Sequence, residues 1–156
     1  MSGFSSSAII LRHVDYSDYD VIVDFFTQRQ GRITAVAKNA KKSKKRFAGA
    51  LELFSGVDAV FTHPRNRSSL PLVTEVFLTH PFPGIRADMT KTAYAAYWAE
   101  IVNRSSEAAS RQAGVFTLLH HVLGALDKEL LEMDKLSILF QIRFMDLLGL
   151  APNVET

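Results

Sequence analysis

Basic side chains gather in one short stretch of this 156-residue sequence. Six of the nine residues in "KNAKKSKKR" are cationic, namely Lys38, Lys41, Lys42, Lys44, Lys45 and Arg46. Ammonium and guanidinium groups attract phosphates and carboxylates, so the cluster favours a phosphate backbone or an acidic peptide as partner. The competing interpretation is a solvated surface loop, and the cluster alone leaves both open.

Further cations lie elsewhere in the N-terminal half. Residues 1–80 hold 11 Lys and Arg against 7 Asp and Glu, whereas residues 81–156 hold 7 against 9. The additional candidates for phosphate contact are Arg32, Arg65 and Arg67. Single strands are also held by stacking on aromatic rings, and the candidates are Phe26, Phe47 and Phe54. The more economical role for each of these rings is to fill a hydrophobic interior.

No arrangement of residues typical of catalysis or metal binding is evident. The histidine pair His120 and His121 would point about 100° apart on a helix, so the two rings would not share one ion easily. The aspartates of "DYSDYDVIVD" lack the glycine and terminal glutamate of a calcium loop, and "KKSKK" lacks the frame of a phosphate-binding P-loop. The sequence predicts a binding protein that is not an enzyme and needs no cofactor or metal.

Composition limits the setting of the chain. Hydrophobic residues make up 47% of the sequence and cysteine is absent, which fits a folded protein in a reducing compartment without disulfides or thiolate zinc sites. No apolar run approaches the roughly 18 residues needed to span a bilayer. The start, "MSGFSSS", does not resemble a signal peptide. We expect a cytoplasmic protein without a membrane partner.

Alternating apolar residues predict five strands in the first half. The expected ranges are 6–14, 19–27, 32–38, 51–63 and 70–79. A sheet this small is best stabilised by closing into a barrel, which removes its exposed edges. Periodicity alone does not separate an OB-fold barrel from an SH3-like barrel. The basic cluster would lie in the long connection between the third and fourth strands.

The pattern changes at "HPFPG", which reads as a linker. Helices are expected over 89–104 with Asp88 as N-cap, from about 110 to 131, and over 134–148 with Gly149 just past the end. The side chains expected to face inward on the last two helices are Phe116, Leu119, Leu123, Leu126, Leu130, Leu136, Leu139, Phe140, Phe144 and Leu147. The prediction is an α+β protein with a five-stranded barrel over 1–80 and a bundle of about three helices over 81–156.

The order of several motifs resembles the RecO family of bacterial DNA repair and recombination mediators. The pieces are "DYSDYD", "FFTQRQGRI", "AVAKNAKKSKKRFAGALELFS", "FPGIRAD" and "LLGLAPN". The resemblance implies an OB-fold followed by a helical domain. It also implies binding of single- and double-stranded DNA, strand annealing, and work at the nucleoid. The implied protein partners are RecR, the acidic C-terminal tail of the single-stranded-DNA-binding protein and, indirectly, RecA.

Two departures from the family pattern matter. Asn39 stands where many members have glycine, and asparagine tolerates the same left-handed turn. The family usually continues into a four-cysteine zinc module, whereas this sequence stops at Thr156, so we expect a truncated or naturally short form without that zinc site. Apolar surface uncovered on the helical domain would then favour self-association. An alternative function is a protein-interaction module that docks acidic tails without binding DNA.

Overall fold

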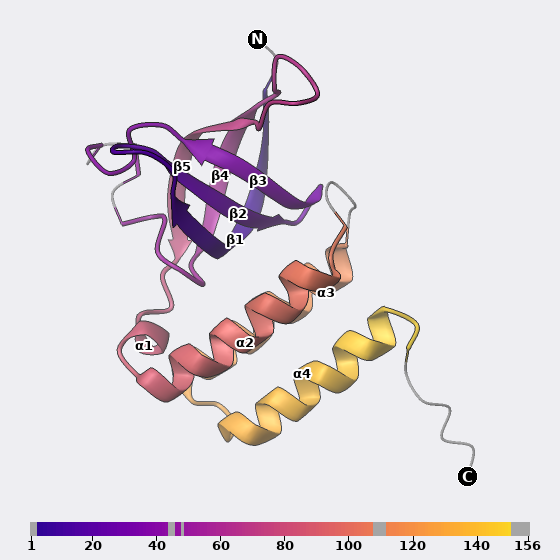
Figure 1. Cartoon of the computed structure of the whole chain (residues 1–156). Coiled ribbons are helices and arrows are strands. Elements are labelled where there is room, and N and C mark those ends of the chain that lie inside the picture. The colour runs from indigo at the N-terminus through magenta and orange to yellow at the C-terminus, as the bar shows by residue number, and fades with distance from the viewer. Residues whose placement is uncertain (1–2, 44–45, 48, 108–111, 151–156) are drawn as a thin grey trace.

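A computed structural model describes residues 3–43, 46–47, 49–107 and 112–150. Five strands precede four helices (Figure 1). The strands are β1 (Gly3–Asp15), β2 (Val21–Thr27), β3 (Gly31–Ala37), β4 (Gly56–Thr62) and β5 (Leu72–His80). The helices are α1 (Pro83–Arg86), α2 (Met89–Ser105), α3 (Ala113–Lys128) and α4 (Met133–Leu147). The expected α+β class and the order of barrel then helices are confirmed.

The strands close into a barrel in the order β1-β2-β3-β5-β4. The long strand β1 pairs antiparallel with both β2 and β4, which joins the two ends of the sheet. A parallel contact between Val36 and Leu72 links β3 to β5. This order is that of the five-stranded OB-fold, so the choice left open by periodicity is resolved.

The hairpin between β2 and β3 depends on two residues of "TQRQG". The Thr27 hydroxyl donates to the Gly31 carbonyl at 2.7 Å and accepts from the Gln30 amide at 3.0 Å. Gly31 has a φ of 67°, which glycine adopts without steric cost. The turn therefore sets the register that brings Asp24 opposite Thr34, and the Thr34 hydroxyl donates to the Asp24 carboxylate at 2.6 Å.

The predicted fourth strand was too long. Residues 51–55 form turns, and β4 begins at Gly56. Phe54 adopts a φ of 69°, which interrupts an extended chain, while its amide donates to the Ile10 carbonyl at 2.9 Å. The segment thus covers one end of the barrel beside β1 and buries the Phe54 ring.

The helix boundaries agree with most of the expected signals. The Asp88 carboxylate accepts from the amides of Thr90 and Lys91 at 2.9 and 3.1 Å, which confirms the predicted N-cap of α2. Gly149 has a φ of 73° just beyond α4, as expected of a residue that ends a helix. The second helix is described only from Ala113, because residues 108–111 lie outside the described ranges.

Three side chains predicted to face inward are exposed instead. Leu130 lies beyond the end of α3, where Glu129 takes a left-handed conformation with a φ of 55°. Leu139 and Leu147 lie on α4, whose buried face is narrower than the predicted apolar stripe. The buried residues of α4 are Leu136, Ser137, Phe140 and Phe144. The tryptophan of α2 fixes this face, because the Trp98 indole donates to the Ser137 hydroxyl at 3.1 Å.

Buried apolar side chains form two clusters, one inside the barrel and one shared by the barrel and the helices. Phe25 points into the barrel, whereas its neighbour Phe26 points outward and is equally buried, stacking on Phe116 of α3 at 6.3 Å between ring centroids. The shared cluster also takes Ile9 and Leu11 from β1. The "HPFPG" segment is therefore not a free linker, since Phe82 is buried in the same cluster.

Candidate nucleic-acid interface

Three connecting segments of the barrel are linked through one of them, which bonds to the second and shares a hollow with the third. They are the β1–β2 turn (16–20), the stretch after β3 (38–43) and the β4–β5 connection (63–71), and we call them the mouth loops. The β4–β5 connection lies at the end of the barrel farthest from the helices (Figure 1). OB-folds bind oligonucleotides with the β1–β2 and β4–β5 loops and the face of strands two and three. The mouth loops are therefore the part of the fold to examine for phosphate contacts.

The stretch after β3 is held against the β1–β2 turn. The Asn39 amide donates to the Asp20 carboxylate at 2.9 Å, and the Lys41 amide donates to the Tyr19 carbonyl at 3.1 Å. Asn39 has a φ of 57°, so it takes the left-handed conformation expected at this position. These contacts order the start of the basic cluster, whereas a freely solvated loop would lack them.

One cation of the cluster already has a counter-ion. The Lys41 ammonium lies 3.2 Å from the Asp15 carboxylate and donates to the Ser17 carbonyl at 2.9 Å. The Asp15 side chain is largely exposed, so water screens this ion pair. Lys41 is consequently less available to a phosphate than its neighbours. Sequence reasoning missed this pairing of the acidic turn with the basic loop.

The other described cations of the cluster keep exposed charges. The Lys42 ammonium lies 3.9 Å from the centroid of the Tyr19 ring, a cation–π contact. The Arg46 guanidinium donates to the Lys38 carbonyl at 2.8 Å and lies 5.1 Å from the centroid of the Phe47 ring. These contacts orient the side chains while leaving Lys38, Lys42 and Arg46 exposed. Lys44 and Lys45 lie outside the described residues.

The structure brings Lys38 and Arg65 together. Both line a hollow of about 410 Å³ between the end of β3 and the β4–β5 connection, with His63 and Ser69 on its wall. Arg67 is exposed on the same connection. Lys38 and Arg65, which are distant in the sequence, therefore line the same hollow.

Arg32 lies elsewhere. Its guanidinium donates to the main-chain and side-chain oxygens of Asn103 in α2 at 3.1 and 3.2 Å. The Asn103 amide in turn donates to the Asp24 carboxylate at 3.1 Å. These bonds connect the barrel to the helices, and the DNA contact predicted for Arg32 stays a prediction.

The aromatic candidates are not accessible. Phe26, Phe47 and Phe54 are all buried, so their rings fill the interior instead of offering faces to bases. The exposed rings of the mouth loops are Tyr16, which is 64% exposed, and Tyr19. The motif "DYSDYD" contains both tyrosines between turn-forming residues, and this signal could have pointed to them.

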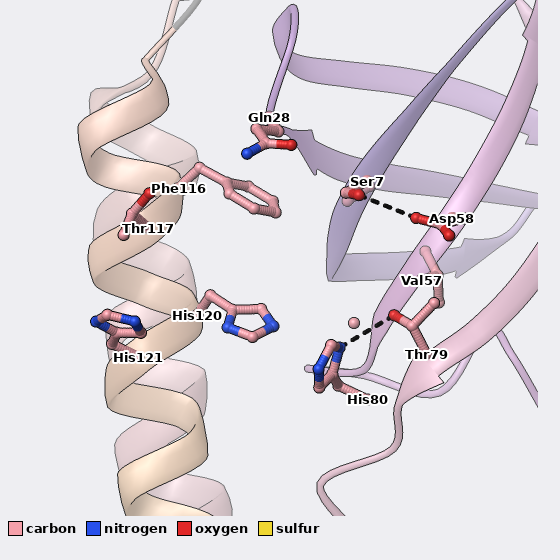
Figure 2. A pocket seen from close by; sticks show the side chains of 12 residues that line it. Ser7, Gln28, Val57, Asp58, Thr79, His80, Phe116, Thr117, His120 and His121 are labelled. Carbon is pink, nitrogen blue, oxygen red and sulfur yellow. Dashed lines mark hydrogen bonds between the residues drawn. The ribbon is translucent and has the colours of Figure 1, made fainter.

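A second hollow, of about 380 Å³, lies between the barrel and α3 (Figure 2). The rings of His80 and His120 contact each other at its wall, with ring centroids 4.5 Å apart, and His121 also lines the hollow (Figure 2). Burial lowers the pKa of His120 below its usual value, and the neighbouring His80 and His121 lower it further. Within the described ranges no three side chains of His, Asp or Glu are placed to hold a metal ion.

The chain also lacks the donors for the zinc module implied by the resemblance, because it contains no cysteine. Among the helices in the described part of the chain, none combines the length and apolarity needed to cross a membrane.

Fold and surface together define an OB-fold protein with an appended helical domain and basic mouth loops. Comparison with known families agrees, because residues 1–82 match the model "Recombination protein O N terminal" and residues 86–156 match "Recombination protein O C terminal". The chain belongs to the RecO family.

Individual relatives of this chain are named "DNA repair protein RecO". "DNA repair protein RecO" of Desulfosudis oleivorans is 54% identical over 99% of this chain, and that of Desulfatibacillum aliphaticivorans is 47% identical over 99%. The protein of that name from Exiguobacterium sp. is 32% identical over 94%. The chain spans only 59%, 60% and 57% of the lengths of these three relatives.

Proposed function

We propose that this chain binds single- and double-stranded DNA through the mouth loops and promotes annealing of complementary strands without any covalent step. The observation that carries the proposal is the single surface formed by Lys38 and Arg65 from two loops of an OB-fold barrel. Membership of a family whose relatives are named DNA repair proteins supports the same assignment.

The mechanism is electrostatic. Cations that neutralise phosphates release condensed counter-ions, and such contacts do not distinguish the bases. A surface of this kind holds two strands near one another and lowers their mutual repulsion. The exposed ring of Tyr16 would add stacking on a base, which is worth about 1–3 kcal/mol by alanine substitution. Asp18 and Asp20, in the same turn as Tyr16, repel phosphates, so the sugar–phosphate backbone would lie on the Lys38–Arg65 side and a base would reach toward the Tyr16 ring.

The cellular location and the protein partners proposed next are those that the family resemblance implies. We propose that the chain acts in the bacterial cytoplasm at the nucleoid and helps to load RecA onto single strands covered by the single-stranded-DNA-binding protein. RecR and the acidic tail of that binding protein would be its protein partners. The relative from Desulfosudis oleivorans is named a DNA repair protein and is longer than this chain, which covers 59% of its length.

Fluorescence anisotropy with a labelled single strand tests the DNA contact. The variant Lys38→Ala/Arg65→Ala/Arg67→Ala removes three exposed cations from the mouth loops. Each phosphate contact on a single strand contributes roughly −0.7 to the slope of log affinity against log salt. If each of the three cations contacts one phosphate, the variant should therefore have a slope that is shallower by about 2. Tyr16→Ala should weaken binding without changing that slope, because stacking releases few counter-ions.

The matched control removes equal charge elsewhere. Arg12→Ala/Arg104→Ala/Lys128→Ala takes three exposed cations from β1, α2 and α3. We expect the control to keep most of its affinity and its salt slope. If the mouth-loop variant is folded by circular dichroism and binds like the unmodified chain, the mouth loops are only a solvated surface and the proposal fails.

A second candidate function rests on a groove of about 590 Å³ along α3. Apolar atoms of Phe82, Ala125 and Leu130 line it, and Lys128 lies at its rim. An acidic tail with terminal apolar residues would place its carboxylates beside Lys128 and its apolar end against Phe82. This is the protein-interaction role, and it is compatible with DNA binding at the mouth loops.

A labelled acidic peptide with an apolar C-terminal residue tests the groove. Lys128→Glu should weaken peptide binding about tenfold or more, because it replaces attraction by repulsion. Arg104→Glu, an equal charge change on α2, should leave it unchanged. Peptide binding that is equal in both variants would exclude the groove as the docking site.

A further inference from the structure

The β1–β2 turn carries two tyrosine rings beside the basic stretch that follows β3. Tyr16 is 64% exposed and Tyr19 is 44% exposed, and both belong to the motif "DYSDYD". Rings on a loop at the mouth of an OB-fold barrel are typical of a surface on which bases stack. The same turn also holds exposed carboxylates, so it combines groups that attract bases with groups that repel phosphates.

Hydrogen bonds hold this turn in one shape. The Tyr16 amide donates to the Asp20 carbonyl at 3.0 Å, and the Asp20 amide donates to the Ser17 hydroxyl at 3.2 Å. From outside the turn, the Lys41 amide donates to the Tyr19 carbonyl at 3.1 Å and the Lys41 ammonium donates to the Ser17 carbonyl at 2.9 Å. Because the backbone is already ordered, stacking of a base on the turn would cost little further conformational entropy.

Tyr16 is the ring better placed to take a base. The Lys42 ammonium lies 3.9 Å from the centroid of the Tyr19 ring, so one face of that ring already contacts a cation. Tyr16 is also the more exposed of the two rings. Stacking requires an unpaired base, because bases inside a duplex are paired and stacked on their own neighbours. The Tyr16 ring can therefore contact a single strand but not the interior of a duplex.

The carboxylates of the turn act against a second backbone. Asp18 is exposed, and the Asp20 carboxylate is held at the turn by the Asn39 amide at 2.9 Å. A single strand can keep its phosphates beside Lys38 and Arg65 and direct its bases toward the turn. A duplex at the same place presents two phosphate backbones, and one that approaches the turn is repelled. Stacking and repulsion therefore favour the same ligand.

We propose that the β1–β2 turn makes this chain distinguish single-stranded from double-stranded DNA. Tyr16 stacks on an unpaired base, and Asp18 repels the second backbone of a duplex. The inference rests on the proposed DNA binding at the mouth loops. In that scheme Lys38 and Arg65 contact the phosphates of either ligand, whereas the turn sets the preference between the two.

Fluorescence anisotropy with three labelled ligands tests the role of Tyr16. The ligands are a single strand, the same strand with abasic nucleotides at its centre, and its duplex. Tyr16→Ala should weaken binding of the intact strand about tenfold and leave the other two unchanged, because neither offers unpaired central bases. Tyr16→Phe keeps the ring and should bind like the unmodified chain. Tyr97→Ala is the control, because Tyr97 is 49% exposed on α2, away from the turn.

The same assay at low salt, about 50 mM, tests the role of Asp18, because exposed charges are then weakly screened. Asp18→Asn should raise the affinity for the duplex about threefold and the affinity for the single strand less. Asp146→Asn makes the same charge change on α4 and should leave the ratio of the two affinities unchanged. Both aspartates are exposed, so circular dichroism should show the native fold in each variant.

The results that would overturn the proposal differ from failure of the proposed function. Equal weakening of all three ligands by Tyr16→Ala, or no weakening of any, excludes stacking at this ring. An unchanged ratio of duplex to single-strand affinity in Asp18→Asn excludes the repulsion. The proposed function itself fails when Lys38→Ala/Arg65→Ala/Arg67→Ala binds all three ligands like the unmodified chain.

Discussion

Among single side chains, His120 is in a place where the fold penalises its charged form. It lies partly buried on α3, with the rings of Phe116 and Phe82 on either side and His80 facing it from the end of β5. His121 is its neighbour on α3, and Asp58 of β4 lines the same hollow. Because burial and two neighbouring histidines lower the pKa of His120, its neutral form belongs to the folded state.

This shift predicts how stability depends on pH. The unfolded chain takes up a proton at His120 near its ordinary pKa of about 6.5, whereas the folded chain does so only at lower pH. Stability is therefore fully present above that ordinary pKa and falls as pH drops through it toward the lower folded value. Thermal melting from pH 8 to about pH 5 should show this fall, and His120→Gln should reduce it.

His13→Gln is the control, because His13 is exposed on β1 and far from this junction in the sequence. It should leave the pH profile unchanged. If the two variants have the same profile as the unmodified chain, acid sensitivity arises from other groups.

At the level of elements, the short helix α1 is hydrogen-bonded both to the barrel side and to α3, and so holds the barrel against the helices. The Gly84 amide donates to the Asp127 carboxylate of α3 at 2.7 Å. The Arg86 guanidinium donates to the Leu53 carbonyl and the Ser55 hydroxyl, both at 3.3 Å. Ile85 between them is fully buried. The motif "FPGIRAD" is thus a joint that contacts both halves at once.

Two glycine substitutions should have opposite effects. A Cβ at Gly84 would lie 2.8 Å from the main-chain oxygen of Asp127, so Gly84→Ala should destabilise the fold by about 1–3 kcal/mol as an overpacked contact. A Cβ at Gly124, inside α3, meets only a ring carbon of Phe82 at 3.7 Å. Gly124→Ala should stabilise the chain by up to about 1 kcal/mol through helix propensity.

Urea unfolding measures both changes. Equal free energies of unfolding for the two variants would mean that α1 does not rest against α3 as described. A stabilising Gly84→Ala would have the same meaning.

For the molecule as a whole, the shared core predicts cooperative unfolding. Phe61 belongs to the cluster inside the barrel, and Trp98, the chain's single tryptophan, belongs to the cluster shared with the helices. If barrel and helices unfold together, Phe61→Ala should lower the midpoint seen by Trp98 fluorescence, with a cost of about 3–5 kcal/mol.

Circular dichroism supplies the comparison, and its midpoint should coincide with that of Trp98 fluorescence in both proteins. A variant whose barrel melts early while the Trp98 signal keeps its original midpoint would show two independent units. In that case the boundary predicted between residues 80 and 81 would also separate two stable domains.

Much of the fold could be predicted because it depends on neighbours in the chain. Alternation predicts the strands, the Asp88 carboxylate reaches amides two and three residues away, and Gly149 adopts the positive φ just beyond α4 without steric cost. The basic cluster was likewise visible as charge density, and the motif order indicated the family before any comparison.

Other features arise from contacts between distant segments, where local pattern carries no information. Burial of Phe26 on the outside of the barrel requires α3 to cover it, and pairing of Lys41 with Asp15 requires the β1–β2 turn to fold beside the basic loop. The common hollow of Lys38 and Arg65 depends on the contact between β3 and β5. Leu139 is exposed because packing on Trp98, through Phe140 and Ser137, selects one narrow face of α4. Whether a side chain is buried depends on which helices and strands pack together. That packing minimises the free energy of the whole chain and cannot be read from a local stretch of sequence.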